Sequence, residues 1–500
     1  MGRRLVAALA VLVSACGTDA AGTLQLVLSL PPQGDLRPTG FATVAVGITY
    51  EGGNENVTTT PLDGMSFTAG DVPLDEPIQL RVELRDNTNR LVAFGRVEQT
   101  ITPDRTNKQI TIPVRKPMIY ISSDKAIVTL DPTLDTSDPK FQGTIAGTPG
   151  ALAFPIDGND VGVVTGASLQ RFATADHKPA GSATNLNVTG VSDAARVPGE
   201  RRMVFAMGGG LVLVNVDTGE TRAMAMAPKP DRVAIGGAPG AYTVYALIGR
   251  VAPPTGTASC TGSSMVLAYS LDEQAELPRT VATGQFSDIE AAGDALYAAS
   301  PCMGKVTRLD ASGAPLSLNV PGVGALAIEG SRLWAAGSGS PVQGQGARIR
   351  IASVRLDGSD AQEVLLPPKA EVMTYDYDQG KELSLNIHAD TLVPIDLAVV
   401  PGAQQIAVLT RMDSHRAARY DTISATKVIP EMNATVQDIV LADPQAGAIT
   451  QRIRAKCVLT LIAKANAEFP DWSCITTSGA EAAAFGDSVP TMVGALYGGR

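Results

Sequence analysis

The chain has 500 residues, of which 44% are hydrophobic and 18% charged, so it is long enough for more than one domain and too apolar to be intrinsically disordered. Its formal net charge of −10 argues against a nucleic-acid partner, because a phosphate backbone repels an acidic surface. Fifty glycines and 33 prolines favour many short strands separated by turns over long helices. We therefore expect an all-β protein.

The first residues have the pattern of an export signal. A short basic start, Met1 to Arg4, precedes the apolar run from Leu5 to Val13. The next residues complete the segment Val13-Ser14-Ala15-Cys16, which resembles a bacterial lipobox. That resemblance implies cleavage before Cys16 and acylation of Cys16, so that residues 1–15 are a signal peptide and 16–22 a short lipidated tether. A plain secretory signal cleaved nearby is the alternative.

The residue after the lipobox bears on the destination. Position 17 is Gly rather than Asp, which by analogy with such lipoproteins implies transfer to the bacterial outer membrane, facing either the periplasm or the cell surface. No later stretch has 18 consecutive apolar residues, so the acyl chains on Cys16 would be the membrane anchor.

Residues 23–115 are predicted to form the first folded unit. Six short runs rich in Val, Leu, Ile, Thr and Phe are separated by turn segments such as Glu51-Gly52-Gly53-Asn54. In residues 79–85 polar and apolar side chains alternate, which is typical of a half-buried strand. This spacing predicts an immunoglobulin-like β-sandwich that acts as a spacer, with an independent binding role as the alternative.

From residue 118 to residue 500 a strand-like motif recurs roughly every 40 residues, a period typical of four-stranded propeller blades. Its eight occurrences begin at Ile119, Val161, Val204, Val244, Leu296, Leu333, Ile406 and Ile449. Several are followed by a second strand that ends in an Asp-containing turn, as in Val214-Asn215-Val216-Asp217-Thr218-Gly219. The segment Leu211 to Glu220 resembles the repeat of YVTN-type and WD40-like bacterial propellers, although the Tyr-Val-Thr-Asn tetrapeptide is absent.

The repeat count favours eight blades, with seven as the alternative because the last repeat is degenerate. The first repeat lacks an innermost strand, and Met492 to Tyr497 has the right character to supply it. Closure of the ring by that segment would remove a free sheet edge.

Three long insertions are expected at one end of the propeller. If the strands of each blade run a to d from the axis outward, 251–264 and 338–348 are b–c loops and 368–393 is a d–a connection. These loops emerge at the same face, and long loops on a rigid scaffold are where binding surfaces commonly lie. Drift in tolerant loops is the alternative.

Four cysteines besides Cys16 form an even set, which suits an oxidising compartment. Cys260 and Cys302 fall in b–c loops of successive blades, whereas Cys457 and Cys474 fall on neighbouring strands of the final blade. We therefore expect the disulfides Cys260–Cys302 and Cys457–Cys474.

Positively charged side chains gather in or beside the predicted b–c loops of this acidic chain. A ring of guanidinium groups could bind a carboxylate or phosphate, although exposed arginines at strand ends are commonly just solvated. The candidate ligand-face residues are Arg250, Arg348, Arg411, His415, Arg416 and Arg452. Asp376, Asp378 and Glu382 are weak candidates for calcium, since their spacing departs from that of a calcium loop.

The sequence contains no motif that identifies a catalytic residue or a cofactor. It has three histidines without metal-binding spacing and no nucleophile elbow, and the predicted innermost strands present mostly Ala, Val, Ile and Leu. We therefore expect a non-catalytic envelope lipoprotein whose propeller binds a protein or glycan partner. A lactonase-like hydrolase with its site in the central channel is the alternative, since the fold permits one.

Overall fold

The structure is a computed structural model of the whole chain. It describes residues 21–31, 36–50, 55–62, 64–73, 78–97, 109–123, 126–134, 137–145, 151–156, 159–187, 189–225, 228–254, 260–272, 278–310, 316–343, 345–368, 370–376, 382–388, 390–400, 405–416, 419–420, 427–429, 432–461, 473–474 and 490–496. These residues form strands and turns and contain no helix, as expected for an all-β protein. Accordingly, none of them belongs to a helix long and apolar enough to cross a membrane. The predicted signal peptide and Cys16 lie outside the described residues.

The N-terminal unit is one curled sheet, not the predicted immunoglobulin-like sandwich. Its seven strands are ordered β3-β2-β5-β6-β7-β1-β4. β7 pairs antiparallel with β6 and parallel with β1, so it joins what would otherwise be two facing sheets into a half-barrel around one apolar core. The strands are β1 (Ala21–Ser29), β2 (Thr43–Tyr50), β3 (Glu55–Pro61), β4 (Ser66–Pro73), β5 (Ile78–Arg85), β6 (Leu91–Arg96) and β7 (Gln109–Arg115).

The rest of the described chain forms a seven-bladed propeller with four antiparallel strands in each blade. The first strands of most successive blades contact one another, so they surround the axis. From the axis outward, blade 1 consists of β40 (Pro490–Leu496), β8 (Met118–Ser123), β9 (Ile127–Leu130) and β10 (Gln142–Ile145); blade 2 of β11 (Leu152–Pro155), β12 (Asp160–Thr165), β13 (Ser168–Ala173) and β14 (Thr184–Asn185); blade 3 of β15 (Asp193–Arg196), β16 (Arg202–Met207), β17 (Gly210–Asn215) and β18 (Thr221–Ala225); and blade 4 of β19 (Arg232–Gly236), β20 (Thr243–Ile248), β21 (Ser264–Ser270) and β22 (Arg279–Gly284). Blade 5 consists of β23 (Asp288–Ala292), β24 (Ala295–Ser300), β25 (Lys305–Arg308) and β26 (Ser317–Asn319); blade 6 of β27 (Ala325–Glu329), β28 (Arg332–Val342), β29 (Gly346–Arg355) and β30 (Gln362–Leu365); and blade 7 of β33 (Thr391–Val399), β34 (Ile406–Arg416), β37 (Met432–Asp443) and β38 (Ala448–Leu461).

The preference for eight blades is wrong, and the reason is local. The eighth motif, at Ile449, lies in β38, which is the outermost strand of blade 7 and not the core of a further blade. The predicted closure is confirmed, because β40 pairs antiparallel with β8 and thereby completes blade 1 from both ends of the chain. This pairing closes the ring by hydrogen bonds between strands from the two parts of the chain.

Apolar packing holds neighbouring blades together. Each of the seven seams contains its own cluster of buried hydrophobic side chains, for example Phe154 and Phe205 between blades 2 and 3. The rings of these two residues meet edge to face with centroids 5.6 Å apart. Because the second strand of each blade is packed on both sides, its residues are almost continuously apolar, which is why the repeat was visible in the sequence.

The half-barrel docks on one end of the propeller, which we call the docked face: the end formed by the a–b and c–d turns. Leu91 is part of the apolar cluster between blades 7 and 1. The Arg96 guanidinium lies 3.5 Å from the carboxylate of Glu329, in the a–b turn of blade 6, and Arg115 Nη2 donates to Asn159 Oδ1 at 2.9 Å. The opposite end, formed by the b–c loops and d–a connections, is left uncovered by the half-barrel; we call it the insertion face.

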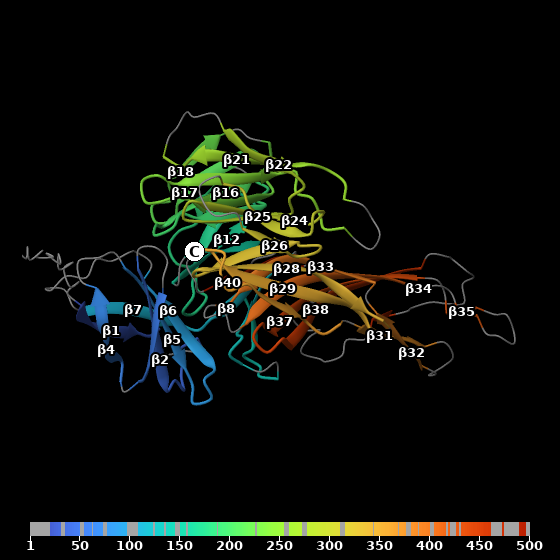
Figure 1. The fold of residues 1–500 in the computed structure, drawn as a ribbon, viewed down its shortest axis with the longest axis horizontal. Helices are drawn as coiled ribbons and strands as arrows, with labels where there is room; N and C mark the ends of the chain where they lie inside the picture. The colour runs from blue at the N-terminus through green and yellow to red at the C-terminus, as the bar shows by residue number, and fades with distance from the viewer. Residues whose placement is uncertain are drawn as a thin grey trace, which may run out of the picture.

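Blade 7 is extended beyond the other blades. Its last three strands have 11, 12 and 14 residues, and a separate hairpin of β31 (Ala370–Asp376) and β32 (Glu382–His388) pairs with β39 (Ser473–Cys474) beside it. A short pair, β35 (Arg419–Tyr420) and β36 (Lys427–Ile429), lies in the b–c connection of blade 7. In Figure 1 these strands project away from the half-barrel.

Candidate functional site: the insertion face and the propeller axis

The three predicted insertions belong to the insertion face. Residues 251–264 connect β20 to β21, residues 338–348 form the end of the β28–β29 hairpin, and residues 368–393 contain the β31–β32 hairpin between blades 6 and 7. The first two are b–c connections and the third is a d–a connection, so all three leave the blades at the same end. Long connections of this kind, held by a rigid ring, are suited to binding.

A disulfide joins two blades on this face. Cys260, in the b–c loop of blade 4, is bonded to Cys302, in the b–c turn of blade 5, with Cα atoms 5.7 Å apart. This confirms the first predicted pairing. Met303 follows Cys302 directly and has 60% of its surface exposed, so an apolar side chain faces solvent beside the disulfide. For the second predicted pair, the strands β38 and β39 are in contact, but β39 pairs with β31 and not with the final blade, and the side chains of Cys457 and Cys474 lie outside the described residues.

The predicted ligand-face arginines do not form one ring, because Arg250 lies at the axis and Arg452 lies in the outermost strand of blade 7. Arg411 is on β34, and its Nε is 3.0 Å from the Asp413 carboxylate. His415 follows on β34, with its Nδ1 3.0 Å from Asn433 Oδ1.

The remaining candidates are placed separately. Arg348 donates from Nε to the Ser340 carbonyl at 3.0 Å within the blade 6 hairpin. Arg452 Nε is 4.0 Å from the buried carboxylate of Asp438. The side chains of Arg416 and of the calcium candidates Asp376, Asp378 and Glu382 lie outside the described residues. Within the described part of the chain, no group of three His, Cys, Asp or Glu side chains could hold a metal ion.

Arg250 spans the mouth of the axis on the insertion face. Its guanidinium donates to three backbone carbonyls of three further blades: Ser287 at 2.7 Å, Ile395 at 2.9 Å and Gly324 at 3.4 Å. Pro253, from the same loop, packs so closely that a Cβ placed on Gly324 would lie 3.0 Å from its Cγ. The predicted anion-binding arginine is therefore used to hold blades together.

Beneath this mouth lies a group of buried charges that the sequence analysis missed. We define the central cluster as Asp193, Arg232, Asp288 and Asp396, which come from the innermost strands of blades 3, 4, 5 and 7. The Arg232 guanidinium lies 3.8, 3.4 and 3.5 Å from the three carboxylates in that order. One cation thus lies within 4 Å of three acids, and buried Glu290 adds a fourth negative side chain nearby. The Arg250 guanidinium at the mouth also interacts electrostatically with the three aspartates.

The carboxylates of the central cluster also bond to backbone. Asp193 Oδ2 accepts from the Val233 N–H at 2.9 Å and Asp288 Oδ2 accepts from the Leu326 N–H at 2.8 Å, each reaching the innermost strand of the next blade. These bonds satisfy strand edges that face the axis. The sequence signal was available: Asp193 and Asp288 begin short innermost strands, and Asp396 interrupts the apolar run of β33.

Burial shapes the ionisation of this cluster. It raises the pKa of Asp193 to about 6, although Arg232 and the Val233 N–H act in the opposite direction. Burial also raises the pKa of Asp288. For Arg232, burial disfavours the charge, but the carboxylates of Asp396, Asp288 and Asp193 outweigh it and raise the guanidinium pKa. The cluster therefore carries an excess of acid that is costly to ionise fully.

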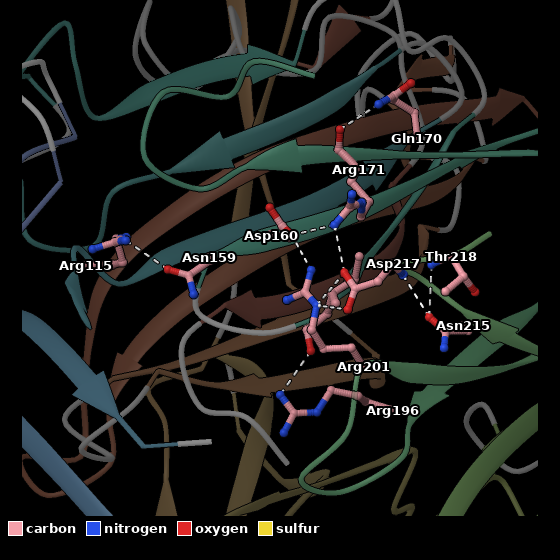
Figure 2. Close-up of polar contacts among 11 residues, drawn as sticks. Arg115, Asn159, Asp160, Gln170, Arg171, Arg196, Arg201, Asn215, Asp217 and Thr218 are labelled. Atoms are coloured by element: carbon pink, nitrogen blue, oxygen red, sulfur yellow. Dashed lines mark hydrogen bonds and ion pairs between the residues drawn. The ribbon is translucent and has the colours of Figure 1, made fainter. Parts of the chain in front are cut away.

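A second charged group, which we call the rim network, ties blades 2 and 3 together at the docked face. It consists of Asp160, Arg171, Arg201 and Asp217 (Figure 2). Arg201 contacts both acids, donating from Nη2 to Asp160 at 2.6 Å and from Nε to both Asp217 oxygens at 2.9 Å. Arg171 bridges the same two carboxylates at 3.3 and 3.2 Å. The network is balanced, with two cations for two acids.

Comparison with known proteins adds little to this picture. No family model matches the chain, and no curated protein matches it. Solved structures with some likeness include Kuenenia stuttgartiensis hydrazine synthase, with 12% identity over 52% of this chain and 75% of that one (TM-score 0.34), and Kluyveromyces lactis Hsv2, with 12% identity over 60% and 98% (TM-score 0.31). The extracellular domain of a candidate one component system from B. thetaiotaomicron matches with 9% identity over 85% and 79% (TM-score 0.32). Likeness at this level carries no argument about function, and the propeller assignment rests on the strand pairing above.

Proposed function

We propose that this protein is a non-catalytic binding module of the bacterial envelope, anchored in the outer membrane through an acylated Cys16, whose insertion face holds a protein or glycan partner. The observation that carries the proposal is the opposition of the two ends of the propeller. The half-barrel, which follows the proposed anchor in the chain, occupies the docked face through Leu91, Arg96 and Arg115. The end with the long connections is then free to meet a partner.

The axis supports binding better than catalysis. A hydrolase in the central channel would need acids or a histidine open to substrate. Here Arg250 and Pro253 fill the mouth, and the acids of the central cluster bond to Arg232 and to backbone N–H groups. Lactone hydrolysis by the purified chain that is lost in Asp288→Asn would overturn the non-catalytic proposal.

Mass spectrometry of the natively expressed protein tests the anchor. An acylated N-terminal peptide beginning at Cys16 is expected, and Cys16→Ser should release the protein from the membrane fraction. Release of propeller peptides by a protease added to intact cells would assign the insertion face to the cell surface, and protection would assign it to the periplasm. An unmodified mature N-terminus would contradict the anchor.

A matched pair of surface variants tests the binding face. Met303→Asp places a charge on the insertion face, whereas Lys178→Glu changes an exposed side chain in the c–d turn of blade 2, on the docked face. Partners captured by cross-linking to the wild-type protein in cells should be lost with Met303→Asp and kept with Lys178→Glu. Equal capture by both variants would place the binding surface elsewhere.

A further inference from the structure

A pocket of about 270 Å³ lies where the half-barrel meets the propeller, on the face opposite the insertions. The β5–β6 turn of the half-barrel supplies one wall, and turns of blades 1 and 7 supply the others. Its lining includes Arg90 and Leu91 from the half-barrel and Pro132, Gln405 and Asp443 from the propeller. Small-molecule sites commonly lie between domains, and this volume is just below their usual range, so the pocket suits a small ligand.

Two opposite charges line the pocket, one from each domain. Arg90 comes from the half-barrel and Asp443 from the c–d turn of blade 7. Both are half-buried. Asp86, in the same turn as Arg90, interacts electrostatically with the Arg90 guanidinium, but among the described residues neither Arg90 nor Asp443 has an ion-pair partner within 4 Å. A half-buried charge without a close ion-pair partner is costly, and a ligand with complementary charges would offset part of that cost.

Both charged groups are already held in place. Arg90 Nη2 donates to the Pro132 carbonyl at 3.2 Å, which fixes the guanidinium across the domain junction. Asp443 Oδ1 accepts from the N–H groups of Gln445 and Ala446 at 2.7 and 2.9 Å, which fixes the carboxylate in its turn. Groups that are ordered before binding lose little entropy when a ligand arrives.

The remaining lining adds one polar and several apolar features. Gln405 lines the pocket, although its Oε1 is buried and has no hydrogen-bond partner among the described residues. Leu91, Pro117, Pro132 and Val400 supply apolar surface to the lining, against which a ligand's side chain could pack. A simple anion would be repelled by Asp443, a simple cation by Arg90, and a neutral sugar would leave both charges uncompensated.

We propose that this pocket binds a small zwitterion, such as a free α-amino acid, with its carboxylate on Arg90 and its ammonium group on Asp443. The ligand would bridge the half-barrel and the propeller and would stabilise their docking. This site is independent of the insertion face and does not rest on the binding role proposed for it.

Calorimetric titration of the full chain with the standard L-α-amino acids, at up to about 10 mM, tests the proposal, since a Kd near 1 mM is readily measured. At least one should bind and raise the unfolding temperature. Its N-acetyl derivative, which lacks the ammonium charge, and its amide, which lacks the carboxylate, should bind at least tenfold more weakly. Absence of binding by every amino acid, or equal binding of the capped forms, would overturn the proposal.

Three variants separate the charges from domain docking. Asp443→Asn keeps the acceptor in the turn but removes the charge, and Arg90→Gln removes the opposite charge; each should weaken binding at least tenfold. Glu329→Gln breaks the Arg96–Glu329 contact, which also joins the two domains but lies outside the pocket lining, and should bind like the wild-type protein. Undiminished binding in the first two variants, or equal loss in all three, would show that these charges do not recognise the ligand.

Discussion

The central cluster and the rim network both join blades through arginine and aspartate, yet they differ in balance, geometry and exposure. In the rim network two cations meet two acids at 2.6 to 3.3 Å, and half of the Asp217 side chain is exposed. In the central cluster one buried cation meets three acids at 3.4 to 3.8 Å, and no member has more than 13% of its side chain exposed.

The difference shows that contacts between the same residue types have different energetic consequences at the partly exposed rim and at the buried axis. At the rim, solvent screens the charges, so the network is a modest and replaceable tie. At the axis, burial raises the cost of every unpaired charge, so the three carboxylates depend mainly on Arg232, with Arg250 as a second and more distant cation. The acids are nonetheless useful there, because they satisfy the N–H groups of neighbouring innermost strands.

Removal of the central cation should have the largest effect. Arg232→Met removes the one cation within 4 Å of the three buried carboxylates and leaves only the more distant Arg250 charge, so it should lower the free energy of unfolding by about 3–5 kcal/mol. Chemical denaturation at pH 7 measures this. Arg355→Met removes an exposed arginine with one long contact and should change stability by less than about 0.5 kcal/mol. Similar losses in both variants would break the distinction between buried and exposed charge.

The disulfide is a third kind of link between blades. Its contribution to stability should depend neither on charge nor on burial, so it provides a reference for the two charged groups. Cys260 and Cys302 are 42 residues apart in sequence, and closing a loop of this length stabilises by about 2–4 kcal/mol. The double variant Cys260→Ser, Cys302→Ser should lose that amount equally in low and high salt. A loss that shrinks with salt would show that charges around the bond carry the effect instead.

The excess acid of the central cluster should make stability depend on pH. The folded pKa of Asp193, about 6, lies above its ordinary value of 3.8, so between these values the folded state binds more protons than the unfolded state. Stability from this group is therefore greatest below about pH 4 and declines as the pH rises towards 6. Asp193→Asn keeps an acceptor for Val233 and removes the titration.

Denaturation curves at pH 4 and pH 7 check this expectation. Relative to Asp193→Asn, the wild-type protein should lose on the order of 1–3 kcal/mol of stability as the pH rises between these values. A constant difference between the two proteins would mean that Asp193 titrates normally and that the cluster is not short of positive charge.

Much of the fold could be predicted from the sequence because it rests on periodicity. The apolar second strands of the seven blades and the closing strand, predicted at 492–497 and found at 490–496, are local patterns. The blade count failed because Ile449 lies in an extended outermost strand whose pattern imitates a core strand. The half-barrel was read as a sandwich because strand runs alone do not reveal that β7 pairs on both sides.

The candidate site was harder to predict because it depends on contacts between distant blades. Arg250 stands in a loop beside other basic residues, and nothing local shows that its guanidinium crosses the axis to Ile395, 145 residues away. The charged residues of the innermost strands were visible but were outweighed by their apolar neighbours. The pairing of Cys260 with Cys302 succeeded because it required only the blade order.

Removal of an arginine from the rim network should cause the smallest loss of stability, and this loss should depend most strongly on salt. Arg201→Gln removes contacts to Asp160 and Asp217, but Arg171 still bridges both acids, so we expect a loss of about 1 kcal/mol at low ionic strength. Because the network is partly exposed, at least half of this loss should disappear in 1 M NaCl, where the Debye length is about 3 Å. The loss in Arg232→Met should be unchanged by the same salt, since its carboxylates are shielded from ions. Equal salt dependence in the two variants would show that ions reach the axis as freely as the rim. Burial could then not explain why Arg232 contributes more to stability than Arg201.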